Sequence, residues 1–333
     1  MATIQQEIQK RILVLDGAMG TMLQRYNFSE EDFRGTRFKD FPYSLKGNND
    51  LLSLTQPQAI RDVHAQYFEA GADIVETNTF SGTTIGMADY HLEDWVYELN
   101  FESAKIAKAV ADEFTAKNPS KPRFVAGSIG PTNRTASMSP DVNDPGYRAV
   151  TFDDLRLAYK QQVEALIDGG CDLLLVETIF DTLNAKAALF AIEEVKEERH
   201  LDIPIMVSGT ITDASGRTLS GQTVEAFLIS ISHIPLLSVG FNCALGADQL
   251  KPYLKRLARN TSLNISAHPN AGLPNAFGQY DQTPEEMQVL IKEYLQDNLI
   301  NIIGGCCGTT PEHIRLIAEI AAEFKPRLIL ETI

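Results

Sequence analysis

The sequence predicts a closed barrel of eight parallel strands with helices outside it. Eight short apolar runs alternate with eight segments of helical periodicity, which is typical of a TIM-type α/β barrel. The apolar runs show little alternation of polar and apolar residues, as expected for strands covered on both faces. An open doubly wound sheet is the alternative, but it does not require eight equal units. We expect residues 1–333 to form one domain.

Each apolar run is expected to form one strand and each periodic segment one helix. The expected strands are 12–15, 73–75, 123–126, 172–176, 203–207, 237–240, 263–267 and 301–303. The expected helices are 57–70, 94–116, 152–167, 182–198, 223–232, 248–259, 284–297 and 311–324. Long loops follow the first and third strands, at 27–55 and 133–151, and could cover a site at that end of the barrel.

The chain is acidic, with a formal net charge of −15 over 333 residues. That charge argues against nucleic acid or an anionic membrane as a partner. The N-terminal residues carry no apolar core long enough for a signal peptide, and no segment has an uninterrupted apolar span suited to a bilayer. We therefore expect a cytoplasmic protein whose four cysteines are reduced.

Three cysteines predict a metal site. Cys306 and Cys307 lie between glycines directly after the eighth apolar run, and Cys243 follows the sixth. A disulfide between adjacent cysteines would be strained, whereas thiolates are soft ligands suited to zinc. Cys243 alone would more ordinarily be a small buried apolar residue. Its position at a strand end, like that of the pair, favours one zinc ion held by all three; Cys171 is assigned no role.

Three thiolates leave the fourth position of a tetrahedral zinc open, as in catalytic sites. A free thiol has a pKa of about 8.5, so only a few per cent is ionised at neutral pH, and zinc would deprotonate it. The predicted reaction is attack by a zinc-bound thiolate on an electrophilic carbon, with methyl or alkyl transfer in view.

Acidic residues at other strand ends could bind an amino acid that carries this thiol. Asp16 and Glu177 are candidate partners for its ammonium group, and Glu76 is a weaker one. Backbone N–H groups of the glycine-rich turn that begins at Gly17 could hold its carboxylate. The ordinary alternatives are a helix N-cap for Asp16 and a salt bridge at the barrel rim for Glu177. His268 is expected to pack or to orient a neighbour and not to bind the metal.

These motifs together resemble the homocysteine S-methyltransferase family. The short motifs are DGAMGT at 16–21, NC at 242–243 and GGCCGT at 304–309. Longer stretches resemble the homocysteine-binding module of cobalamin-dependent methionine synthases: KGNND at 46–50, GPTNRT at 130–135, SMSPDVNDP at 137–145, GTITDASGRTLS at 209–220 and AHPNAGLPNAF at 267–277. The similarity covers nearly the whole chain.

The resemblance implies zinc on Cys243, Cys306 and Cys307, homocysteine as substrate, and roles for Asp16 and Glu177 in holding it. It also implies that Asn270 matches a weak oxygen ligand that fills the fourth zinc position before substrate arrives. The expected reaction is methylation of homocysteine to methionine, a step of amino-acid biosynthesis. No cobalamin-binding signature is found in the sequence. Methylcobalamin is therefore expected on a separate cobalamin- and folate-binding module or chain.

Three alternatives remain open at this point. S-methylmethionine or S-adenosylmethionine could be the methyl donor. A glycoside hydrolase could use Asp16, Glu76 and Glu177 as acid and base, although this leaves the thiols unexplained. A non-catalytic subunit could bind zinc and present homocysteine to a partner.

Overall fold

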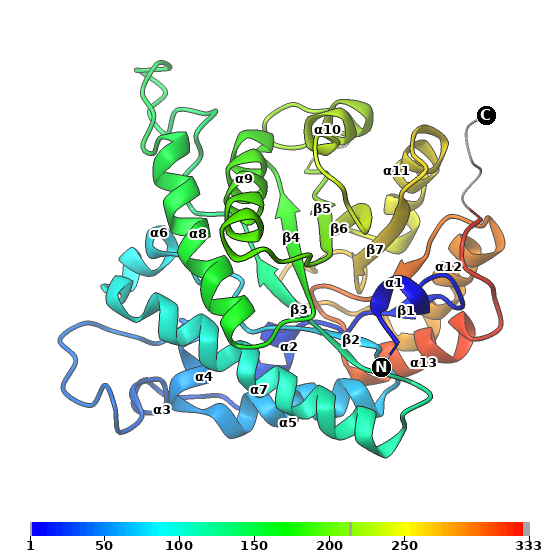
Figure 1. Cartoon of the computed structure of the whole chain (residues 1–333), viewed down its shortest axis with the longest axis horizontal. Coiled ribbons are helices and arrows are strands. Elements are labelled where there is room, and N and C mark those ends of the chain that lie inside the picture. Colours follow the sequence, from blue (N-terminus) through cyan, green and yellow to red (C-terminus); the bar gives the residue numbers. More distant parts are fainter. Residues whose placement is uncertain (1, 213–214, 329–333) are drawn as a thin grey trace.

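The computed structural model describes residues 2–212 and 215–328 and shows the expected barrel (Figure 1). Eight parallel strands follow one another in the order β1-β8-β7-β6-β5-β4-β3-β2, and a bridge between Leu15 and Ile74 joins β1 to β2. The strands are β1 (Leu13–Val14), β2 (Ile74–Glu76), β3 (Phe124–Ile129), β4 (Leu173–Ile179), β5 (Ile205–Gly209), β6 (Ser238–Gly246), β7 (Asn264–Asn270) and β8 (Ile302–Ile303). The predicted fold class is confirmed.

The eight predicted helices are present, with ends within a few residues of those expected. They are α5 (Pro57–Glu69), α7 (Val96–Lys117), α8 (Phe152–Asp168), α9 (Thr182–Arg199), α10 (Val224–Ile231), α11 (Ala247–Asn260), α12 (Pro284–Gln296) and α13 (Pro311–Ala321). Prolines begin α5, α12 and α13, where a missing N–H costs no helical hydrogen bond. In Figure 1, α8 and α9 lie side by side outside β3 and β4.

Short helices that the sequence analysis did not predict lie in the connections. They are α1 (Ile4–Glu7), α2 (Met19–Gln24), α3 (Glu30–Arg34), α4 (Leu52–Thr55), α6 (Thr84–Met87) and three 3₁₀ turns at Asn49–Leu51, Ala88–Tyr90 and Glu93–Trp95. Their few residues give too little periodicity to detect. The segment 27–55 is therefore partly helical, whereas 133–151 is irregular and projects beyond the end of α8 (Figure 1).

The floor of the barrel is apolar. Ile4 and Ile8, in and just after α1, pack on inward-facing residues of the strands, among them Leu13, Phe124 and Met206. A second, larger core lies between the outer face of the strands and the surrounding helices. Neither the floor nor the outer core contains a cysteine of the predicted metal site, so both serve as scaffold.

The inner face of the barrel changes from apolar to polar toward the carboxyl ends of the strands. On β4, Leu173 and Leu175 belong to the floor cluster, and Glu177 follows on the same face two residues later. The same step gives Glu76 after Ile74 on β2 and Ser128 after Ala126 on β3. Strand periodicity therefore directs the polar side chains into the open end of the barrel.

Five strands extend at least two residues further than predicted: β3 ends at Ile129, β4 at Ile179 and β5 at Gly209, and β6 and β7 are also longer. β6 continues to Gly246 and so includes Cys243, and β7 continues to Asn270. The prediction ended each strand close to the end of its apolar run, but hydrogen bonding to a neighbouring strand does not depend on the side chain. Among the described residues, no helix is both long and apolar enough to span a membrane.

Candidate metal centre and substrate pocket

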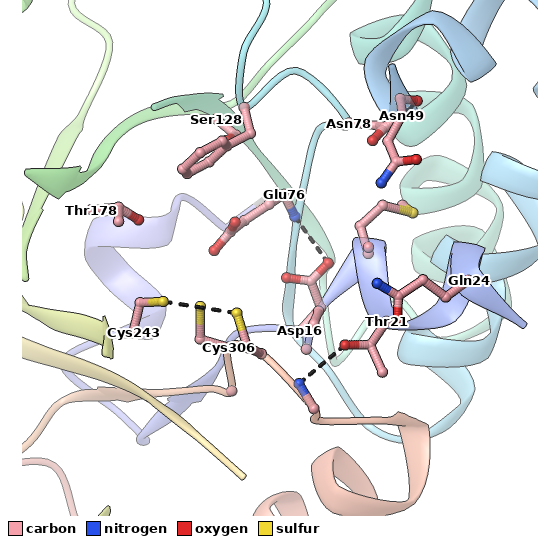
Figure 2. Close-up of a pocket in the computed structure, with 18 of the residues that line it drawn as sticks. Asp16, Thr21, Gln24, Asn49, Glu76, Asn78, Ser128, Thr178, Cys243 and Cys306 are labelled. Carbon is pink, nitrogen blue, oxygen red and sulfur yellow. Dashed lines mark hydrogen bonds between the residues drawn. The ribbon is translucent and has the colours of Figure 1, made fainter. Parts of the chain in front are cut away.

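A cavity of about 880 Å³ opens at the carboxyl ends of the strands (Figure 2). Its wall includes residues in or just after β1, β2, β3, β4, β6, β7 and β8: Asp16, Glu76, Ser128, Glu177, Asn242, Cys243, His268, Cys306 and Cys307. The loop at 47–50 also lines it, whereas no residue of 133–151 does. Of the two long loops expected to cover the site, the structure therefore brings only the first to the cavity.

The three predicted ligands lie together. The sulfur atoms of Cys243, Cys306 and Cys307 all lie within 4.8 Å of one another, and those of Cys243 and Cys307 are 3.8 Å apart. Two sulfur ligands on one tetrahedral zinc, each at about 2.3 Å from the metal, would be about 3.8 Å apart. The cluster therefore fits a zinc ion held by three thiolates. Figure 2 shows Cys243 and Cys306 at one side of the pocket.

The turn that carries Cys306 and Cys307 is attached to β7. Cys306 N–H donates to the Pro269 carbonyl at 2.9 Å, and the Cys307 carbonyl accepts from Ala271 N–H at 2.9 Å. Gly308 has a φ of +81°, and a Cβ built on it would lie 2.3 Å from the Cβ of Tyr280. Glycine is therefore required beside the cysteine pair, for both its conformation and its size.

The backbone at Cys243 is also unusual. Cys243 and Ala244 have φ values of +59° and +57°, and the pairing of β6 with β7 loses register between Asn242 and Gly246. Thr178 on β4 has a φ of +53°, which is rare for a β-branched residue and costs on the order of 1–3 kcal/mol. Strain of this kind persists only where the surrounding contacts impose it, which is common at functional sites.

The crowded thiols affect one another's ionisation. Hydrogen bonds from Cys243 and Cys306 lower the pKa of Cys307 to about 3. Hydrogen bonds to Cys243 and Cys307 raise the pKa of Cys306 well above its ordinary value. One negative charge is thus favoured and a second is opposed, so a divalent cation is needed to hold all three as thiolates.

Three carboxylates share the cavity with the thiols. Burial raises the pKa of Asp16 and of Glu76 well above their ordinary values, and neighbouring carboxylates raise both further. Burial also raises the pKa of Glu177, whose Oε1 accepts a short hydrogen bond from Ser128 Oγ. Asp16 Oδ2 accepts from the Glu76 N–H at 3.1 Å. Figure 2 shows Asp16 and Glu76 between the sulfur cluster and the opposite wall.

This arrangement favours a cationic ligand. Asp16 is 3% exposed and Glu177 5% exposed, and neither has an ion pair with a basic side chain among the described residues. Burying a carboxylate without a counter-ion is costly, so the site gains most from a ligand that supplies the positive charge. The ammonium of an amino acid is such a group, and its thiol could reach the sulfur cluster in the same cavity.

The comparison with known families agrees with this geometry. Residues 13–321 match the homocysteine S-methyltransferase family. This chain belongs to that family. Among solved structures, the metallated form of the homocysteine methyltransferase MmuM from Escherichia coli has 25% identity and a TM-score of 0.72, covering 93% of this chain and 96% of the other. Its oxidized form has 25% identity and a TM-score of 0.71, covering 92% and 95%.

Membership of the homocysteine S-methyltransferase family makes methyl transfer to homocysteine the general activity of this chain. It gives no support to the glycoside hydrolase alternative.

The glycine-rich turn that begins at Gly17 also lies at the cavity. Gly17 lines the cavity, and a Cβ on it would lie 2.7 Å from Thr309 Oγ1. The next N–H, of Ala18, donates to that hydroxyl at 3.2 Å.

His268 and Asn270 lie on the inner face of β7, and Cys171 lies elsewhere. His268 is 2% exposed and lines the cavity, and burial lowers its pKa to about 3, so it is neutral. Asn270 is 1% exposed, and its Oδ1 has no hydrogen-bond partner among the described residues. A buried acceptor without a partner is consistent with a ligand atom, which keeps Asn270 a candidate. Cys171 packs against the outer core, away from the cluster.

The sequence analysis did not identify several cavity residues. Thr178, Asn242 and Tyr280 all line the cavity beside the cysteines. Asn242 directly precedes Cys243, and Gly308 follows the cysteine pair, so local sequence held a signal for both. Tyr280 and Thr178 carry no such signal, because an isolated segment does not show which residues lie beside the cysteine cluster.

Proposed function

We propose that this chain methylates homocysteine to methionine at a zinc site formed by Cys243, Cys306 and Cys307. The observation that carries the proposal is the presence of three sulfur atoms within 4.8 Å of one another beside three carboxylates in one cavity. Zinc bound there would act as a Lewis acid that lowers the pKa of the homocysteine thiol, so that the thiol ionises near neutral pH.

The polar residues of the chain would bind and orient the amino acid. Asp16 and Glu177, with a smaller part for Glu76, would accept hydrogen bonds from its ammonium group, which also neutralises their buried charge. N–H groups of the turn at Gly17 and the start of α2 would hold its carboxylate, because the first N–H groups of a helix have no partner within it. The Ala18 N–H is excepted, since it donates to Thr309 Oγ1. These contacts direct the sulfur toward the cysteine cluster. Asn270 Oδ1 would contact the metal before homocysteine arrives.

The methyl transfer itself is a single displacement. The homocysteine sulfur attacks the methyl carbon, the carbon–sulfur bond of methionine forms, and the bond from methyl to donor breaks with its electron pair remaining on the donor. Cavities of roughly 300–1,000 Å³ hold drug-sized ligands, so homocysteine alone would leave much of the 880 Å³ cavity for a second reactant.

We propose methylcobalamin as the donor, carried by a separate cobalamin- and folate-binding module or chain. The similarity of several motifs to methionine synthases supports this choice. Exposed apolar side chains on loops at the cavity end of the barrel also support a protein partner there; Leu219, Leu273 and Phe277 are 59%, 51% and 89% exposed. The competing donors are S-methylmethionine and S-adenosylmethionine.

The decisive experiment combines metal analysis with a donor assay. The purified chain should contain about one zinc per molecule, and methionine should form from homocysteine with methylcobalamin. C306S should lose both the zinc and turnover, whereas C171S, altered in the outer core, should retain the zinc. Turnover with a sulfonium donor but not with methylcobalamin would overturn the proposed donor. Absence of zinc from the wild-type chain would overturn the proposed site, and zinc without turnover with any donor would favour a non-catalytic role.

A further inference from the structure

Asn242 lies on β6, and its side chain connects β6 to β4, although these two strands are not neighbours in the barrel. Its Oδ1 accepts hydrogen bonds from Thr178 N–H on β4 at 3.0 Å and from Ser208 Oγ on β5 at 2.7 Å. Its Nδ2 donates to Thr178 Oγ1 at 2.7 Å. Asn242 is 1% exposed, so these bonds form away from bulk water, where losing one is most costly.

Asn242 and Thr178 are each adjacent in sequence to a residue of the proposed site, one in the metal-binding part and one in the part that binds the amino acid. Asn242 directly precedes Cys243, which is a proposed metal ligand. Thr178 directly follows Glu177, which is a proposed ammonium partner. Figure 2 shows Thr178 and Cys243 on the same side of the cavity. A shift of either backbone would therefore move a metal ligand or a substrate contact.

Neither backbone is positioned by regular strand pairing at this point. The pairing of β4 with β5 loses register between Val176 and Ile179, and that of β6 with β7 between Asn242 and Gly246. Thr178 and Cys243 both have positive φ. Because the ladder hydrogen bonds are interrupted at both places, side-chain hydrogen bonds must hold these segments.

We propose that Asn242 is a positioning residue that couples metal binding at Cys243 to amino-acid binding at Glu177. The inference rests on the proposed function and deepens it. The carboxamide makes two hydrogen bonds with Thr178 and one with Ser208, and so holds the end of β6 in a defined position relative to the end of β4. Homocysteine bound at both parts of the site then stabilises the metal site, and the metal strengthens homocysteine binding by the same factor.

The coupling can be measured without turnover. Zinc-loaded protein is titrated to equilibrium with a competing chelator, and the zinc affinity is measured with and without homocysteine. In the wild-type chain homocysteine should raise the zinc affinity about 5-fold or more, the lower end of typical coupling between two sites. In N242A the zinc should still bind, but homocysteine should raise its affinity less than about 2-fold. Homocysteine should also bind more weakly to N242A.

Variants of the partner residue test the hydrogen bonds themselves. T178S keeps a hydroxyl acceptor for Asn242 Nδ2 and should keep most of the coupling, whereas T178V removes the acceptor at similar volume and should lose part of it. N301A is a matched control. Asn301 is 2% exposed and makes two hydrogen bonds at the opposite end of the barrel, to Ile265 N–H at 2.9 Å and to the Arg327 carbonyl at 3.1 Å. N301A should melt at a lower temperature with its coupling intact.

The outcomes separate the inference from the proposed function. Wild-type coupling in N242A, or equal coupling in T178S and T178V, would overturn the inference alone. Loss of coupling in N301A to the same extent as in N242A would show a general effect of destabilisation and would also overturn it. If N242A does not fold, the comparison of T178S with T178V decides. A wild-type chain that binds neither zinc nor homocysteine would overturn the proposed function and the inference with it.

Discussion

The Sγ atoms of Cys243 and Cys307 lie 3.8 Å apart, although 64 residues separate the two in the chain. They meet because β6 and β8 both pair with β7 and end at the same rim of the barrel. Cys306 adds a third sulfur within 4.8 Å. These distances between sulfur atoms suit three ligands of one metal ion. If a metal is bound there, the three thiols should react more slowly than in the metal-free chain, so their reactivity reports on metal binding.

Metal removal should expose these thiols to modification. Thiolates bound to zinc react slowly with a disulfide reagent, because their electron pairs are engaged with the metal. After chelation of the metal we expect up to three more cysteines per chain to react. When zinc is added back before the reagent, the same cysteines should again be protected. C306S should show fewer protected thiols, whereas C171S should leave the protected set unchanged. Equal reactivity before and after chelation would contradict a shared metal.

Gly308 should tolerate alanine poorly. Alanine at a φ of +81° costs about 1 kcal/mol, and overpacking against Tyr280 adds about 1–3 kcal/mol, because the new Cβ would lie 2.3 Å from the Tyr280 Cβ. Displacement of the turn should also weaken zinc binding. The matched control is G221A, where φ is +88° and nothing lies within 4 Å of the new Cβ. In chemical denaturation, G221A should lose only the free energy of unfolding that alanine costs at positive φ, whereas G308A should lose more. Equal losses of unfolding free energy in the two variants would exclude the steric effect.

Amino-acid binding should release protons and strengthen as the pH rises. Burial raises the pKa values of Asp16, Glu76 and Glu177 above ordinary values of 3.8 and 4.5, so the empty cavity retains protons at pH values where exposed carboxylates have none. An ammonium beside them favours the ionised form, so binding competes with protonation. Calorimetry in buffers of different ionisation enthalpy should detect the release.

A ligand without a thiol separates this effect from ionisation of the substrate sulfur. Methionine has the same ammonium and carboxylate groups, and its affinity should also rise from about pH 5 toward neutrality. The rise should stop at the pH where the cavity carboxylates are already ionised without ligand. In D16N and E177Q this dependence should become weaker. A methionine affinity that stays constant over that range would contradict the assignment of the carboxylates.

Glu76→Gln should stabilise the chain while weakening homocysteine binding. Because the folded-state pKa of Glu76 is raised, ionisation above the unfolded-state pKa destabilises the fold, and this loss grows as the pH rises toward the folded-state pKa. The neutral amide avoids it, so we expect about 1 kcal/mol of added stability near neutral pH and a smaller gain near pH 5. Thermal unfolding at the two pH values measures the difference. Glu113, an exposed partner of Arg61, offers a control in E113Q, where no such gain should occur.

The sequence contained most of the information on the scaffold and part of the information on the site. The apolar runs located all eight strands because each strand is buried on both faces, but they ended the strands β3 to β7 too early. The adjacent Cys306 and Cys307 between glycines indicated a metal ligand pair without any structure. Thr178 and Tyr280 could not be assigned in this way, because their importance depends on contacts with Asn242 and with the turn at Gly308.

By itself, the sequence determined the succession of strands and helices and the chemical types of residue at the strand ends. Both follow from local periodicity and residue chemistry, which act over a few positions along the chain. Only the tertiary structure decided that Cys243 reaches the cysteine pair, that three carboxylates share one cavity, and that the Asn242 amide connects β4 to β6. Closure of the barrel brings these distant residues together, and their geometry depends on register breaks and positive φ angles that no short stretch of sequence specifies.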